Sequence, residues 1–228
     1  MLFWGNYLGV VMDGNVPVFA VSHTQLGVTK QLLAEEVYQR VGASIIDGSL
    51  PPGHRIRDAE LAAQFRVSRM PIREALQRLE RIGLVEMYPS RYTQVTEVTP
   101  ELTAKTLEFA GYVGGAIAAI AVPRLSGEER TEAAQQALAL NDALDDPAAI
   151  STARWSFIRY LAERDDNDIF RTVLEETSML MFRNLRPWSL STAESDRMRT
   201  IHAQLAEAIL SGDAAEAEHL VRAMHLVD

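Results

Sequence analysis

The stretch ELAAQFRVSRMPIREALQRLERIGLVE, residues 60–86, holds two short amphipathic segments joined by a tight turn. In a helix, successive residues are rotated by about 100°, so the second segment separates into two faces. The apolar face gathers Ile72, Ala75, Leu76 and Leu79. The opposite face gathers Arg69, Met70, Arg73 and Gln77. We expect Ser68 to cap this helix, Pro71 to lie in its first turn and Gly83 to end it.

The flanking segments extend this pattern on both sides. Residues 29–48 place Leu33, Val37, Val41 and Ile45 at four-residue steps, with Leu32 and Ile46 beside them, which predicts a buried helical stripe closed by Gly48. A turn-rich connector, SLPPGHRIR, follows, and Asp58 is the expected N-cap of the next short helix. Residues 84–98, LVEMYPSRYTQVTEV, alternate around a Pro-Ser turn and predict a two-stranded ribbon. Helix, helix, tight turn, helix and ribbon is the order of a winged helix-turn-helix.

Charge is unevenly distributed along the 228 residues, whose formal net charge is −9. Residues 100–228 hold twelve basic and twenty-one acidic residues, whereas residues 29–99 hold ten and nine. Within residues 66–81, five arginines stand against two glutamates. An acidic chain with one local basic face can bind a polyanion at that face alone.

The two arginines of the polar face suggest how such a polyanion is bound. Arg69 and Arg73 lie one turn apart near the start of a helix, and an arginine can donate two hydrogen bonds to guanine in the major groove. Ser68 and the first free backbone N–H groups are suited to a phosphate. The alternative is an ordinary solvated surface; the preceding turn and the following ribbon favour DNA.

After Thr99 and Pro100 the sequence predicts helices only. Thr99 is the expected cap, and capping boxes recur at Ser126 with Glu129 and at Ser191 with Glu194. The predicted helices span residues 100–122, 127–144, 147–164, 168–186, 192–211 and 213–226. We therefore expect a mainly α protein, with a winged helix-turn-helix domain at 29–99 and an all-helical domain at 100–228. A bundle of this size can enclose a ligand cavity.

Residues 1–28 fit neither domain. They predict a hairpin with an Asp-Gly turn, or a disordered or misassigned start for which Met12 is another initiator. Cysteine is absent, which excludes disulfides and thiolate chemistry and fits a reducing cytosol. The opening lacks a basic segment and a span long enough for a membrane, so we expect a cytoplasmic protein.

Residues 61–85 resemble the DNA-binding signature of the GntR family of bacterial transcription regulators. Residues 29–228 are more weakly similar to the FadR branch of that family, whose helical effector domain is of the FCD type. The resemblance implies a homodimer that binds a palindromic operator and senses a small, usually acidic, metabolite. It assigns base contacts to Arg69 and Arg73 and places the side chains of Arg66, Ser68 and Met70 beside the DNA backbone. The resemblance also implies that Ser90, Arg91 and Tyr92 contact DNA from the wing, the ribbon at residues 84–98. The family commonly has glycine near the tip of this ribbon, where this sequence has PSRYT.

Many FCD domains bind a divalent metal through one Asp and three His. The corresponding positions here hold Arg154, Ile158, His202 and Met224, with His225 one step out of register. One imidazole does not hold such an ion, so we expect no metal cofactor. Arg154 is instead expected to replace the metal and bind an effector carboxylate; the alternative is a surface ion pair with an aspartate of residues 164–168. Trp155, Arg183 and Tyr112 are further candidates for the cavity wall.

Two other functions stay open. The sequence lacks a Gly-rich phosphate loop, a nucleophile elbow and a His-Glu-x-x-His motif, so a metal-dependent enzyme has little support. A DNA-binding dimer whose helical domain senses nothing agrees with the same residues. We favour a metabolite-responsive repressor.

Overall fold

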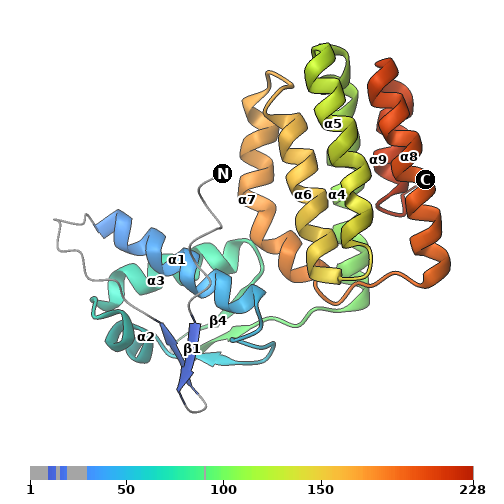
Figure 1. The fold of residues 1–228 in the computed structure, drawn as a ribbon. Helices are drawn as coiled ribbons and strands as arrows, with labels where there is room; N and C mark the ends of the chain where they lie inside the picture. Colours follow the sequence, from blue (N-terminus) through green and yellow to red (C-terminus); the bar gives the residue numbers. More distant parts are fainter. Residues whose placement is uncertain (1–9, 14–15, 20–29, 90, 228) are drawn as a thin grey trace. The chain divides into compact units, whose positions relative to one another are not determined.

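The computed structural model describes residues 10–13, 16–19, 30–89 and 91–227, and the chain divides into two compact units, 1–98 and 99–228 (Figure 1). The boundary lies one residue before the expected one at 99/100. The fold is mainly helical, with a small antiparallel sheet in the first unit, in agreement with the expected fold class.

The first unit contains α1 (Lys30–Ile46), α2 (Asp58–Phe65) and α3 (Arg69–Arg81) with a three-stranded sheet. The strands are β3 (Arg55–Ile56), β4 (Val85–Tyr88) and β5 (Tyr92–Val95), in the order β3-β5-β4. The predicted ribbon is β4 and β5, which pair antiparallel with Tyr88 opposite Tyr92. The third strand was not predicted; it comes from the connector, where Arg55 and Ile56 pair with Gln94 and Thr93.

The core of this unit follows the predicted apolar faces. On α3, Ile72, Ala75, Leu76 and Leu79 are fully buried. On α1, which packs against α3, the buried residues are Val37, Val41 and Ile45, whereas Leu32 is exposed. Gly48 follows α1 with a φ of 83°, a left-handed conformation that glycine adopts without strain.

One of the two predicted N-caps in this unit is wrong, and the other is confirmed in position but makes no side-chain bond. Arg57 precedes α2 as its N-cap, so Asp58 is the first helical residue and its carboxylate is used elsewhere. Ser68 does occupy the N-cap position of α3, but its side chain makes no capping hydrogen bond.

Part of the N-terminal segment forms the predicted hairpin. Strands β1 (Val10–Asp13) and β2 (Val16–Phe19) pair antiparallel, with Asp13 opposite Val16. Residues 1–9, 14–15 and 20–29, including the expected Asp-Gly turn at Gly14, lie outside the described residues.

The described part of the second unit forms the six predicted α-helices. They are α4 (Pro100–Ala121), α5 (Gly127–Ala139), α6 (Pro147–Ala162), α7 (Asp168–Leu185), α8 (Thr192–Ser211) and α9 (Ala214–Ala223). Short 3-10 helices, η1 (Val122–Arg124) and η2 (Leu140–Ala143), follow α4 and α5. Thr99 caps α4, and both predicted capping boxes are formed. Helix α9 ends three residues before its predicted end at 226, which matters for the site below.

Among the described residues, one helix, Pro100–Arg124, has the length and apolar composition of a membrane span. More than half of its most apolar window is buried in the protein, and α4 packs against α6, α7 and α9. Its glycines permit this packing: a Cβ added at Gly114 would lie 3.1 Å from both Ile158 and Val221. This helix is therefore the core helix of the unit.

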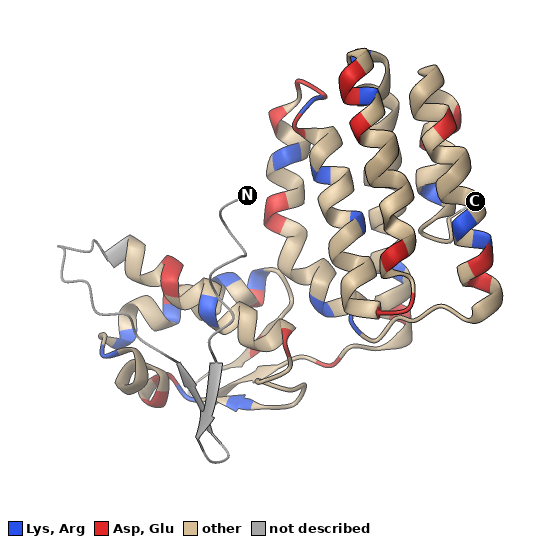
Figure 2. Ribbon diagram, in the orientation of Figure 1, with Lys and Arg blue, Asp and Glu red and all other residues tan. Residues whose placement is uncertain are grey.

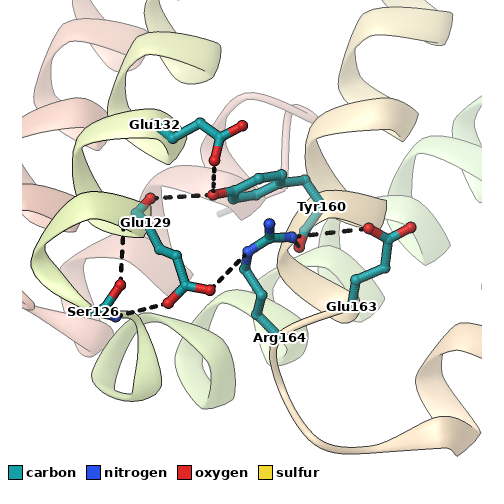
Figure 3. A network of polar contacts seen from close by, with 6 residues as sticks. All are labelled: Ser126, Glu129, Glu132, Tyr160, Glu163 and Arg164. Atoms are coloured by element: carbon teal, nitrogen blue, oxygen red, sulfur yellow. Dashed lines mark hydrogen bonds and ion pairs between the residues drawn. The ribbon is translucent and has the colours of Figure 1, made fainter. Parts of the chain in front are cut away.

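A polar network joins α5 to α6 (Figure 3). Tyr160 on α6 donates a hydrogen bond of 2.8 Å to the Glu132 carboxylate on α5. Arg164 pairs with Glu129 at 3.2 Å, and Glu129 also accepts from the backbone N–H of Ser126. The capping box of α5 is thus continuous with the α5–α6 packing.

Candidate DNA-binding surface and effector cavity

The turn between α2 and α3 sets the direction of α3. Arg66 has a φ of 54°, a left-handed conformation that is uncommon for a residue other than glycine. The backbone N–H of Val67 then donates to the carbonyl of Ala62, which closes the tight turn. Because the Ser68 hydroxyl makes no capping bond, it stays available at the helix N-terminus.

The outward face of α3 is the predicted one. Arg69, Met70, Arg73 and Gln77 are all exposed, and Met70 retains 55% of its surface, a large exposed fraction for an apolar side chain. The helices of this unit carry both basic and acidic side chains (Figure 2). Whether the outward face of α3 is basic therefore depends on which of its arginines are paired with a carboxylate.

The two arginines of this face differ in their pairing. Within the described residues, Arg69 forms no hydrogen bond or ion pair. Arg73 Nε lies 2.9 Å from Asp58 Oδ2, and the Arg73 side chain remains 63% exposed. An exposed pair of this kind contributes less than about 1 kcal/mol, so a stronger partner can displace the carboxylate.

Two of the residues predicted to contact DNA from the wing, the hairpin of β4 and β5, differ in exposure. Arg91 is exposed. The Tyr92 ring is half-buried, 4.8 Å from the Tyr88 ring, and the Arg55 guanidinium lies 4.2 Å from its centroid. The sequence did not predict Arg55 at the wing, because only its strand pairing in β3 brings it there. Ser90 lies outside the described residues.

The second unit contains a cavity with mostly apolar walls. Thirteen residues line it. Arg154, Trp155 and Ile158 of the predicted set line it. Further lining residues were not predicted: Phe109, Ala110, Val113, Gly114, Ser151, Leu174, Met181, Leu185, Trp188 and His225. They come from α4, α6, α7 and the segments after α7 and α9, so only the packing of these helices brings them together.

Arg154 is the one charged residue among those that line the cavity. Its side chain is buried, with 3% exposed; one terminal nitrogen, Nη2, lies 3.4 Å from the Met198 sulfur, and the guanidinium is 4.8 Å from the Trp188 centroid. Its Nε and Nη1 have no hydrogen-bond partner among the described residues. Burial lowers the pKa of Arg154 to about 9, so the group is still protonated at neutral pH. The alternative surface ion pair with residues 164–168 is wrong, because Arg154 is buried and pairs with no carboxylate in the described chain.

At the C-terminal turn, His225 lines the cavity in place of the expected Met224. Helix α9 ends at Ala223, and Leu226 adopts a φ of 63°, so helical spacing no longer applies beyond that point. His225 lines the cavity and its Nδ1 donates to the Val221 carbonyl at 2.8 Å. Met224 is fully buried in the apolar core instead.

The other predicted effector residues lie outside the cavity lining. His202 is completely buried, and its Nδ1 donates to Asn141 Oδ1 at 2.8 Å. Arg183 is buried in α7 and does not line the cavity. Tyr112 is half-exposed, with the Arg222 guanidinium 5.8 Å from its ring. Apolar and aromatic spacing along a helix does not tell which of two helix faces meets a cavity.

The residues at the metal-ligand positions do not fit a metal ion. A buried, protonated guanidinium stands at the first position and would repel a divalent cation; two of its nitrogens have no partner in the described part of the chain. Within the described chain no three His, Cys, Asp or Glu side chains come together as a ligand set.

The first unit is thus a winged helix-turn-helix whose third helix, α3, has an exposed basic face, and the second is an all-helical domain with a cavity that Arg154 lines. This pairing defines a class of two-domain DNA-binding regulators. The family models agree: residues 33–95 match "Bacterial regulatory proteins, gntR family", and residues 106–226 match the "FCD domain". The chain belongs to the GntR family of transcription regulators and carries an FCD domain.

Individual relatives agree with this assignment. The HTH-type transcriptional regulator LutR of Bacillus subtilis is 28% identical over 197 residues, which cover 76% of this chain and 89% of LutR. The HTH-type transcriptional repressor RspR of Escherichia coli is 32% identical over 76 residues, 33% of either chain. Among solved structures, E. coli McbR/YncC superposes with a TM-score of 0.61 at 20% identity, covering 85% of this chain and 93% of that one, which shows a shared fold.

Proposed function

We propose that this regulator is a cytoplasmic, metabolite-responsive repressor that binds a palindromic operator as a homodimer. The observation that carries the proposal is the exposed polar face of α3, where Arg69 has no partner among the described residues and Arg73 is mostly exposed. Each guanidinium can donate two hydrogen bonds to a guanine, and Ser68 can contact a phosphate. Gln77 and Met70 extend the same face.

A small acidic metabolite in the cavity of the second unit is the proposed effector. A ligand that prefers one arrangement of the dimer changes operator affinity by the same coupling free energy. The buried cation in the cavity supports a sensing domain over a merely dimerising one. We infer a regulator without a metal cofactor, and not an enzyme, because the family and the named relatives are transcription regulators and the metal-ligand positions do not suit a metal.

The test uses duplex DNA selected from a random pool by the full-length protein, followed by fluorescence anisotropy. Arg69→Ala is expected to weaken binding to the selected site by roughly 1–3 kcal/mol. Arg81→Ala, an exposed arginine in the last turn of the same helix, is the matched control and should change affinity little. Affinity should also fall steeply with salt. Equal loss in both variants, or selection of no duplex at all, would contradict the proposal.

A further inference from the structure

The starting observation is a buried positive charge whose counter-ion is missing from the described protein. Arg154 has 3% of its surface exposed, yet a thioether and an indole ring lie beside it, and two of its nitrogens have no partner among the residues that the structure describes. Burying a charge without an opposite charge is strongly unfavourable. A counter-ion that enters from outside, through the adjacent cavity, removes this imbalance.

The other polar groups of the cavity wall carry no charge of their own. The Ser151 hydroxyl donates to the Pro147 carbonyl within its own helix. His225 donates its Nδ1 proton to the Val221 carbonyl, and burial lowers its pKa to about 3, so the ring is neutral at physiological pH. The wall therefore provides one positive charge. A ligand with two negative charges would leave one of them buried and unpaired.

The remaining wall determines the body of the ligand. Phe109, Val113, Leu174, Leu185 and the two indoles of Trp155 and Trp188 give the rest of the wall an apolar surface. The Trp188 ring holds one side of the Arg154 guanidinium through a cation–π contact. An anion with an apolar or aromatic body satisfies both the charge and the surroundings.

We propose that the cavity binds a monocarboxylate with an apolar body, and that Arg154 holds its carboxylate directly, in the place where related domains use a metal ion. This deepens the proposed function, since the monocarboxylate would be the effector. Binding of the acid, however, is measured without DNA.

The first experiment needs no variant. Full-length protein in EDTA is titrated with phenylacetate and hexanoate, each compared with its neutral amide, and with succinate and inorganic phosphate. At least one monocarboxylate is expected to raise the melting temperature and to bind in calorimetry, because it binds the native state selectively. Its amide, succinate and phosphate are expected to have no effect. Equal binding of acid and amide, binding only after a divalent metal is added, or no response to either monocarboxylate would overturn the proposal.

The second experiment separates ligand binding from a structural role. Arg154→Met should raise the dissociation constant of the binding acid at least roughly tenfold, since it removes a charge-assisted hydrogen bond. The melting temperature of the ligand-free variant should equal or exceed that of the wild type, because an unpaired buried charge is gone. A lower melting temperature with unchanged acid affinity would show a structural arginine and refute the proposal. Arg199→Met, an exposed arginine on α8, is the control and should keep the affinity.

The same variants distinguish this proposal from the DNA-binding function. Arg154→Met should bind the selected duplex like the ligand-free wild type. Arg69→Ala should bind the acid normally and the duplex weakly. Loss of acid binding in Arg69→Ala would overturn the separate cavity site, whereas loss of duplex binding alone concerns only the recognition helix.

Discussion

Two buried histidines should make the second unit sensitive to mild acid. Burial, and then the nearby charges of Arg154 and Arg199, lower the pKa of His202 from 6.5 to about 4. Burial and then Arg154 lower the pKa of His225 to about 3. Both rings are therefore neutral in the native protein at pH 5, whereas in the unfolded chain they bind protons below 6.5.

The sign and size of the effect follow from proton linkage. Where the unfolded state binds more protons, the free energy of unfolding falls as the pH falls. The contribution is fully present above pH 6.5 and is lost progressively toward pH 4 for His202 and toward pH 3 for His225. When the pH is lowered from 7.5 to 5, protonation of the unfolded chain at each of these histidines should lower the free energy of unfolding by about 2 kcal/mol.

Urea denaturation at both pH values, followed by circular dichroism, measures this loss. His202→Gln and His225→Gln should each reduce the difference between pH 7.5 and pH 5 by about 2 kcal/mol, because Gln does not titrate. His219→Gln, on the exposed face of α9, is the matched control and should leave the difference unchanged. An unfolding free energy that stays constant, or rises, from pH 7.5 to 5 and is insensitive to the buried substitutions would refute the reasoning.

Two smaller substitutions test single contacts. Asp58→Asn releases Arg73 and removes a negative charge beside the recognition face, so duplex affinity in anisotropy should rise severalfold with little change in stability; weaker binding would mean that Asp58 positions the guanidinium. Tyr160→Phe removes the hydrogen bond to the exposed Glu132 carboxylate and should lower the unfolding free energy in urea by about 1 kcal/mol; an unchanged midpoint would show that the α5–α6 network adds nothing to stability.

The sequence predicted the features that depend on neighbours in the chain. Apolar periodicity located the helices of both units, and the caps at Thr99, Ser126 and Ser191 marked where helices begin. The exposed face of α3 followed from the same periodicity, because the side that packs against α1 determines the opposite one. The predictions that fail at helix ends are the N-cap at Asp58 and the last turn of α9. They fail because one or two local hydrogen bonds decide where a helix begins or ends.

The sequence by itself therefore determined the class of protein and its candidate DNA-binding face, since helix periodicity and capping act over three or four residues. Only the tertiary structure decided the chemistry of the cavity. Arg73 meets Asp58 across 15 positions, and Arg154 meets Met198 across 44. Arg154 has no counter-ion among the described residues, and His225 lines the cavity. Both features depend on how several helices pack and on where α9 ends. Charge pairing in a protein interior is a property of three-dimensional neighbours, which spacing along a chain does not specify.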